Sequence, residues 1–153
     1  MPQVALSRMR LRGNMNSILS DKKPLVATGE FSVTLSAPEA VLHEGEPTSG
    51  RHTLSKTYQG GLQGRASGEM LSAGQPQNGQ ASYVAIESFT GSLGGQTGGF
   101  SLAHFGEMDN GSETLKVNIV PGSGNGELTG IRGHLQIRRD AGKHFYTLTY
   151  WII

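Results

Sequence analysis

Two ionisable side chains, those of Glu87 and His104, stand among apolar residues, where they could take part in acid-base chemistry. Glu87 and Tyr83 share one face of the segment 81–93, and His104 alternates with apolar residues in the segment 99–105. A carboxylate inside an apolar site has a raised pKa and can act as an acid or base near neutrality. A neighbouring imidazole can hold it, polarise a substrate oxygen or relay a proton. Our hypothesis is that Glu87 and His104 are catalytic residues.

Further polar side chains share faces with apolar ones and could line the same interior. The residues that we expect to bind a ligand are Tyr83, Lys56, Tyr146 and Tyr150. Lys56 stands between Leu54 and Tyr58 and could be an inward partner for Glu87. The alternative for Lys56 is an alkyl stem that lies along the outer surface.

Strands are the elements that must position these side chains. The chain has 23 glycines in 153 residues, which disfavours helices, and these glycines are interspersed with residues that suit strands. Apolar and polar residues alternate with a period of two, as in strands with one buried face. The strands are expected at residues 27–35, 51–59, 62–72, 81–93, 99–105, 114–120, 127–138 and 144–153.

Short glycine-rich turns separate most of these segments. They include Gly60-Gly61, Gly94-Gly95, Asn78-Gly79 and Asn110-Gly111, and the last two are typical of two-residue type I′ hairpins. The segment 39–50 lacks a pattern and is predicted to be a long surface loop. Sequential antiparallel strands favour an eight-stranded up-and-down β-barrel, because closure removes both sheet edges. A two-sheet sandwich is the alternative.

The segment 120–133 holds five glycines, which could wrap a phosphate or allow a sharp bend. It lacks the third glycine of a dinucleotide-binding fingerprint, because Glu127 stands at that position. The Gly-Lys pair at 142–143 is followed by His144 rather than by the Ser or Thr of a P-loop. We therefore interpret these glycines as structural and expect no cofactor.

The remaining composition narrows the classes of site and partner. The chain has no cysteine, and its five histidines show no metal-ligand spacing, so no metal site is expected. No apolar run approaches a membrane span, and the start of the chain lacks the apolar core of a signal peptide. The expectations are no membrane association and a cytoplasmic location.

Charge divides the chain into two parts. Residues 1–23 hold five basic residues and one acidic residue, whereas the rest holds eight basic and eleven acidic residues. We expect a disordered basic extension over residues 1–23 and a single domain over residues 24–153. Translation could alternatively begin at Met15. A weakly acidic domain argues against nucleic-acid binding.

Four stretches together carry a family resemblance: residues 81–93, 98–106, 120–133 and 144–150. They resemble an uncharacterised bacterial family, domain-of-unknown-function family 3224, over about residues 27–150. The resemblance implies a barrel like that of allene oxide cyclase and assigns no activity. The segment 126–133 is also similar to the Gly-x-Phe-x-Gly-x-x-Gly run of plant allene oxide cyclases, with Leu128 in place of the Phe. No catalytic position of those enzymes can be placed on this chain.

Three functions remain open at this point. The leading hypothesis is a barrel that binds a small apolar ligand in its interior. The second is an isomerase or cyclase that uses Glu87 with His104 or a tyrosine, and the third is a structural module with a filled interior. Val84 and Ile86, which lie opposite Tyr83 and Glu87, predict an apolar outer face, and so do Phe145, Trp151 and Ile153. We therefore expect a homo-oligomer.

Overall fold

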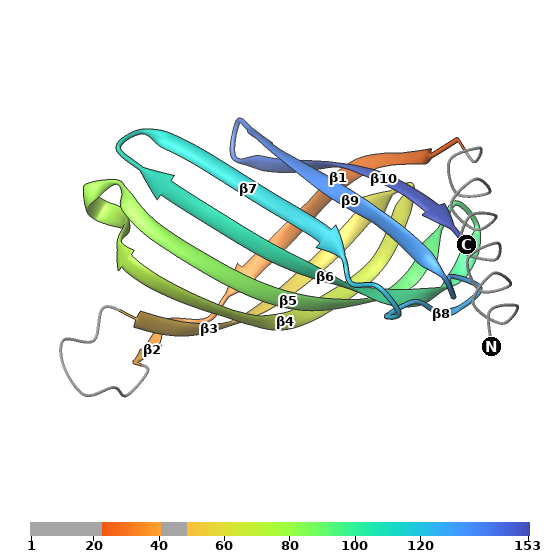
Figure 1. Cartoon of the computed structure of the whole chain (residues 1–153), viewed down its shortest axis with the longest axis horizontal. Helices are drawn as coiled ribbons and strands as arrows, with labels where there is room; N and C mark the ends of the chain where they lie inside the picture. The colour runs from red at the N-terminus through yellow and green to blue at the C-terminus, as the bar shows by residue number, and fades with distance from the viewer. Residues whose placement is uncertain (1–22, 41–48) are drawn as a thin grey trace, which may run out of the picture.

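Eight long antiparallel strands form a closed β-barrel in the computed structural model (Figure 1), which describes residues 23–40 and 49–153. The all-β, eight-stranded fold expected from the alternation of residues is confirmed. The long strands are β1 (Leu25–Leu35), β3 (Ser49–Gly60), β4 (Leu62–Gln75), β5 (Gln80–Leu93), β6 (Gln96–Asp109), β7 (Ser112–Ile119), β9 (Ile131–Asp140) and β10 (Lys143–Ile152). Two short strands, β2 (Glu39–Ala40) and β8 (Asn125–Gly126), pair with β3 and β6.

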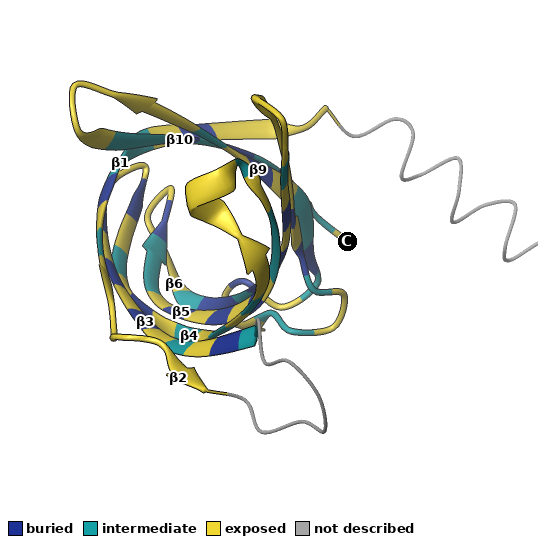
Figure 2. Cartoon of the chain, turned by 90° about the vertical axis from the view of Figure 1, so that its left-hand side faces the viewer, coloured by how far each residue is buried: buried dark blue, intermediate teal, exposed yellow. Residues whose placement is uncertain are grey.

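The first strand closes the barrel, because β1 pairs on both of its edges. It runs antiparallel to β10 through register pairs such as Phe31↔His144 and to β3 through pairs such as Phe31↔Tyr58. The view along the barrel shows the strands forming a ring (Figure 2). The two-sheet sandwich is therefore wrong for this chain.

The seam between β7 and β9 is the weakest in the wall. Of the residues that the structure describes, one bridge pair, Asn118↔His134, joins these two strands. Toward the end that carries the β6–β7 turn, the two strands splay apart, and the β9–β10 turn stops short of the other turns (Figure 1). The wall is therefore lower and open on this side.

The opposite end of the barrel is filled by apolar side chains. Leu62, Leu93, Leu128, Ile131 and Leu148 all have no exposed surface, and Phe89 and Phe100 lie among the core residues. The predicted strand 127–138 is corrected to Ile131–Asp140, because residues before it form consecutive turns. Gly130, the last of these turn residues, has a φ of 86°, which is unsuited to a strand. The glycine stretch thus turns Leu128 inward, where it caps the core.

The turns agree with the expectation in part. Asn110 and Gly111 both have positive φ, at 47° and 88°, as the predicted type I′ turn requires. The expected two-residue turn at Asn78-Gly79 is wrong: residues Pro76–Asn78 form a 3₁₀ turn that Gly79 ends at φ 73°. Pro76 supplies the fixed φ with which such a turn begins.

Part of the predicted surface loop at 39–50 is strand, because Glu39↔Arg51 and Ala40↔Gly50 pair in register. Residues 41–48 of that loop lie outside the described residues, as does the predicted basic extension apart from Lys23. None of the helical residues in the described part of the chain forms a segment long and apolar enough to cross a membrane.

Candidate functional site

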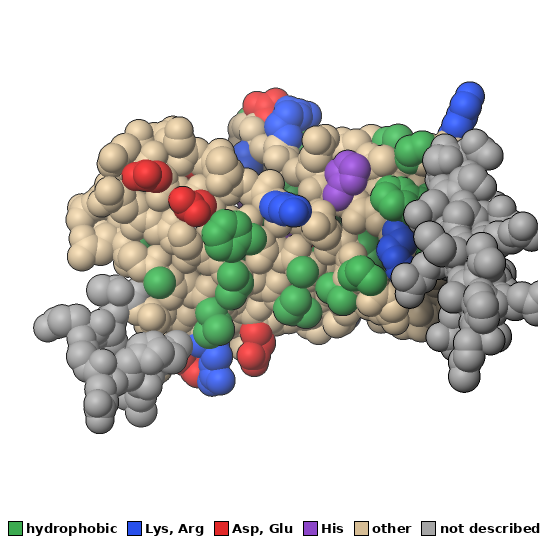
Figure 3. Space-filling model, viewed as in Figure 1, with side chains coloured by type: hydrophobic (Ala, Val, Ile, Leu, Met, Phe, Trp, Pro, Cys, Tyr) green, Lys and Arg blue, Asp and Glu red, His purple; other side chains and the backbone are tan. Residues whose placement is uncertain are grey.

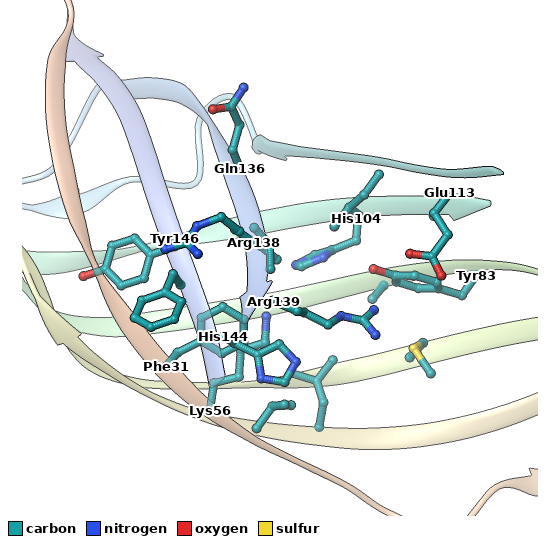
Figure 4. A pocket seen from close by; sticks show the side chains of 18 of the residues that line it. Phe31, Lys56, Tyr83, His104, Glu113, Gln136, Arg138, Arg139, His144 and Tyr146 are labelled. Carbon is teal, nitrogen blue, oxygen red and sulfur yellow. The ribbon is translucent and has the colours of Figure 1, made fainter. Parts of the chain in front are cut away.

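The half of the barrel nearer the β6–β7 turn is not filled, and it encloses a cavity of about 1530 Å³ including its mouth. Inward-facing residues of β1, β3, β5 and β6 line it, with Phe31, Lys56, Tyr83 and His104 among them (Figure 4). The lining continues past both edges of the open seam, from Leu115 on β7 to Gln136 on β9. The cavity therefore opens at the end of the barrel and sideways between β7 and β9.

A carboxylate at mid-barrel collects three hydrogen bonds at the inner end of this cavity. Glu87 Oε1 lies 2.8 Å from Nζ of Lys56 and 2.6 Å from Nε2 of His104, and Oε2 accepts a bond of 2.9 Å from the Tyr58 hydroxyl. Glu87 has no exposed surface, and its three partners are also buried. An ionised carboxylate only accepts hydrogen bonds, so Nε2 of His104 carries a proton.

Small residues on the intervening strand make this contact between β3 and β5 possible. On β4, Ala66 lies in register between Lys56 of β3 and Phe89 of β5. Gly68 lies in the same way between Leu54 and Glu87. A Cβ atom at Gly68 would collide with the carbonyl oxygen of Ile86 and come within 2.7 Å of Cα of Glu87. The row of small residues thus lets the Lys56 side chain reach across β4 to Glu87.

The pKa of Glu87 shifts in the direction opposite to the sequence-based expectation. Burial is the largest influence and alone would raise it. The hydrogen bond from His104, the charge and hydrogen bond of Lys56 and the charge of His104 together outweigh burial, so the pKa of Glu87 lies below its ordinary value. Burial first, and then the negative charge of Glu87, raise the pKa of Tyr58, so its hydroxyl remains a donor. Glu87 is therefore an ionised anchor, and an acid-base role for its carboxyl group is disfavoured.

The residues of this cluster differ in whether they face the cavity. Lys56 and His104 line it, whereas Glu87 and Tyr58 lie behind them. No fully buried side-chain nitrogen or oxygen in the described part of the chain lacks a hydrogen-bond partner. Nδ1 of His104 makes no hydrogen bond with the described residues, so it must be open to the cavity. A ligand would thus meet His104 rather than Glu87.

Tyr83 lies beside this cluster on the cavity wall. Its ring centroid is 6.5 Å from that of His104, and its ring covers Gly106, where a Cβ atom would collide with the Tyr83 ring carbons. The hydroxyl makes no hydrogen bond with the described residues, and the side chain is only half-buried. The absence of a side chain at Gly106 therefore lets the Tyr83 ring lie against the wall. The Tyr83 hydroxyl has no partner among the described residues.

The two tyrosines of β10 do not have the ligand-facing hydroxyls that the sequence suggested. The Tyr146 hydroxyl lies 2.8 Å from the carbonyl oxygen of Gln59 and 3.0 Å from that of Leu62, and it accepts a bond from the Leu62 amide. It clamps the β3–β4 turn and has no hydrogen-bonding capacity left. Tyr150 is buried at the filled end and does not line the cavity. The Tyr146 ring nevertheless lines the cavity (Figure 4), so ligand contact through the ring stays a prediction, whereas Tyr150 packs in the apolar core.

Two residues around the cavity, Phe31 and Arg139, were missed by the sequence reasoning. Phe31 lies under Lys56, with Nζ 4.5 Å from its ring centroid, and it also packs against the stacked ring of His144 at 5.1 Å and the tilted ring of Tyr58 at 5.4 Å. Arg139 pairs in register with His144 and points into the cavity toward Tyr83 (Figure 4). Arg139 could have been predicted from the alternation of Leu135, Ile137 and Arg139, which places all three on the same face. It was missed because the predicted strand ended at residue 138.

The outer wall carries an apolar surface over β4, β5 and β6 (Figure 3). Leu71, Val84, Ile86 and Phe105 are each about half exposed there, and the register places Val84 between Leu71 and Phe105. Of the other residues expected on an apolar outer face, Ile153 is exposed, while Phe145 and Trp151 are intermediate. Homo-oligomerisation through such a face stays a prediction.

No group of three or more His, Cys, Asp or Glu side chains among residues 23–40 and 49–153 is arranged to hold a metal ion. The polar groups of the cavity are instead suited to contacting an organic molecule, because hydroxyl, imidazole and guanidinium groups alternate with apolar side chains.

The comparisons with known proteins give a family and a fold. The model of the family "Protein of unknown function (DUF3224)" matches residues 27–150. A solved structure of a DUF3224-family protein of unknown function from Shewanella oneidensis MR-1 is similar, with 42% sequence identity and a TM-score of 0.79. The match covers 86% of this chain and 98% of that one. No curated protein matches the chain.

Proposed function

This chain belongs to the DUF3224 family, a family of unknown function, and we propose that it binds a small, largely apolar molecule inside the barrel. The observation that carries the proposal is the division of the interior into a filled half and an open half of about 1530 Å³ including the mouth. A protein interior is normally filled by side chains at close packing. An unfilled, mostly apolar cavity with a few fixed polar groups is the usual form of a small-molecule site.

The lining fits such a ligand in two ways. Phe31, Val33, Leu54, Met70, Ala85 and Leu115 supply apolar surface. Nδ1 of His104 and the Tyr83 hydroxyl have no hydrogen-bond partner among residues 23–40 and 49–153, and Glu87 holds the His104 ring in orientation at 2.6 Å. Fixed polar groups on an apolar wall select a ligand by orientation as well as by size.

Native mass spectrometry of the protein from its own host, followed by thermal shift with a panel of apolar compounds, tests the proposal. A ligand at about 100 times its Kd adds about 2.7 kcal/mol of stability, which raises the Tm by several degrees. A protein that emerges without a bound molecule and shows no shift with any compound would contradict ligand binding.

A matched pair of variants locates the binding. Ala85→Phe adds a ring inside the cavity, whereas Ala73→Phe adds the same ring on the exposed outer face of β4. The first should abolish the ligand-induced shift, and the second should preserve it. Equal shifts in both variants would place the ligand outside the barrel.

The second candidate function, an isomerase, is favoured by the open Nδ1 of His104. In that function His104 takes a proton from a carbon beside a carbonyl group and returns it to another carbon, while Glu87 positions the ring. A captured ligand incubated with the protein in deuterated water would then gain deuterium, and His104→Asn would stop the exchange. Absence of exchange with the wild-type protein leaves binding as the function and excludes this chemistry.

A further inference from the structure

Polar groups without protein partners meet on one side of the cavity. The side chain of Arg139 is exposed at the mouth of the cavity, points into it (Figure 4) and makes no hydrogen bond or ion pair with any described residue. The hydroxyl of Tyr83 and the ring nitrogens of His144 are also unpartnered within residues 23–40 and 49–153, and both side chains are half-buried. A guanidinium and two neutral donor groups therefore surround one volume at the mouth.

We propose that the ligand is an organic monoanion, whose carboxylate- or sulfonate-like head group binds Arg139 between His144 and Tyr83 and whose apolar body fills the cavity below. This inference rests on the proposed binding function and specifies the chemical class of its ligand. A guanidinium presents donors in a planar fork that matches such a head group, and charge-assisted bonds are stronger than neutral ones.

Two other cations line the cavity, and both are already paired: Arg138 with Asp140 at 3.3 Å, and Lys56 at the inner end with Glu87. Lys56 Nζ lies 2.8 Å from Glu87 Oε1 and 3.5 Å from the Tyr58 hydroxyl, and the Phe31 ring covers it at 4.5 Å. An anion at Lys56 would have to approach the buried carboxylate of Glu87. Arg139 has no such competing partner, so the head group belongs at the mouth and not at the inner end.

The positive charge of Arg139 reaches both neighbouring groups. Burial has the largest effect on the pKa of His144 and lowers it, and the charges of Arg139 and then of Lys56 lower it further. The charge of Arg139 also opposes the rise that burial causes in the pKa of Tyr83. Both effects place the guanidinium close to the imidazole and the phenol. His144 is therefore neutral near neutrality and donates one hydrogen bond without adding charge.

The charges of the lining favour one negative charge over two. Glu113 on β7 also lines the cavity, and no ion pair joins it to Arg139. A second negative charge on the head group would face this carboxylate across the mouth. The apolar body would extend toward Leu54, Phe31 and Ala85, which lie deeper in the barrel.

Two fluorescent probes with the same aromatic body test the proposal. Anilinonaphthalene sulfonate carries one negative charge, and phenylnaphthylamine is its neutral counterpart. Arg139→Gln should weaken binding of the sulfonate about tenfold, which corresponds to about 1.4 kcal/mol, and leave the affinity for the neutral probe unchanged. Arg65→Gln is the matched control, because Arg65 is exposed on the outer face of β4 and does not line the cavity. It should change neither affinity.

The possible outcomes separate the two proposals. If the wild-type protein binds neither probe, the proposed binding function fails, and this inference fails with it. If both probes bind and Arg139→Gln affects them equally, or affects neither, the cavity binds apolar molecules but the assignment of an anionic head group is overturned. An equal effect of Arg65→Gln on the sulfonate would also overturn it, because the charge effect would then belong to the outer surface.

Competition distinguishes the possible sources of the anion. Naphthoate, naphthyl phosphate and naphthylmethanol offer a monoanion, a dianion and a neutral group on one ring system. Naphthoate should displace the sulfonate probe most strongly, and Arg139→Gln should remove its advantage over the alcohol. Stronger displacement by the phosphate would overturn the monoanion assignment and indicate a phosphate ester as the ligand class.

Discussion

The Nε2 atom of His104 lies 2.6 Å from the Oε1 atom of Glu87, and only the histidine borders the cavity. The carboxylate sits behind the imidazole, where it fixes the tautomer and orientation of the ring. The same carboxylate neutralises Lys56. In the proposed function, Glu87 would therefore act on a bound ligand through His104 and Lys56, as a positioning residue.

Removal of the Glu87 charge should destabilise the barrel strongly. Glu87→Gln leaves the ammonium of Lys56 buried without a counter-charge, for which the expected loss is about 3 kcal/mol in the free energy of unfolding. Glu69→Gln, on the exposed face of the neighbouring strand, should cost less than about 0.5 kcal/mol. Urea denaturation measures both, and equal stability of the two variants would contradict a buried ion pair. Adding Lys56→Met to Glu87→Gln should restore part of the loss.

Stability should fall on acidification in two ranges. The pKa of Glu87 is lower in the folded than in the unfolded chain, so its contribution is full above its ordinary value of 4.5 and is lost as the pH falls through the lower folded value. His144 also has a lowered pKa, so protonation below its ordinary value of 6.5 favours unfolding as well. Urea midpoints measured from pH 8 to pH 3 should show a steep loss below pH 4.5 in the wild-type protein. Glu87→Gln should lack the loss of stability below pH 4.5. If its urea midpoints depend on pH as those of the wild-type protein do, the prediction is wrong.

The titration of His144 reports on the arrangement at the mouth without any ligand. Burial, and then the charges of Arg139 and Lys56, lower its pKa below 6.5. Arg139→Gln should raise this pKa toward 6.5, and Arg138→Gln should leave it unchanged. Nuclear magnetic resonance of the ring protons follows both variants. An insensitive His144 would mean that Arg139 points away from it in solution.

Gly106 should matter for Tyr83 more than for the fold. A methyl group at Gly106 would meet the Tyr83 ring, which can move, rather than the backbone. Gly106→Ala should therefore displace the phenol and weaken probe binding several-fold, with a modest loss of stability. The control, Gly68→Ala, would collide with the backbone of Ile86 and Glu87 and should cost far more stability. Unaltered binding in Gly106→Ala would show that the Tyr83 hydroxyl does not contact the ligand.

The apolar outer wall predicts self-association. Val84 and Ile86 are 47% and 53% exposed and adjoin Phe105 and Leu71 on the neighbouring strands, a continuity that is unusual for a surface in water. Sedimentation at micromolar concentration should show a homo-oligomer that Val84→Lys with Ile86→Lys dissociates. A wild-type protein that sediments as a monomer would contradict the prediction.

The resemblance to the DUF3224 family is confirmed, but membership of this family does not assign a function to the chain. The family is one of unknown function, so the proposed function depends on the residues of the cavity. The wall of the barrel was readable because period-two alternation requires no knowledge of distant contacts. Asn110-Gly111 was likewise readable, because a type I′ turn demands particular residues. The turn at Pro76 was misread because its proline shifted the bend by two residues.

The amino-acid sequence determined that strands form, that they pair in order, and that Lys56, Tyr83, Glu87 and His104 share faces with apolar residues. Only the tertiary structure decided that one half of the barrel is filled and the other open, because the inward turn of Leu128 and the single bridge between β7 and β9 depend on how the sheet closes. It also decided the direction of the Glu87 pKa shift and the meeting of Arg139 with Tyr83. Burial of a carboxyl group opposes its ionisation, whereas a nearby cation favours it. Which effect is larger depends on distances of a few ångströms between side chains on different strands, and strand tilt and register set those distances.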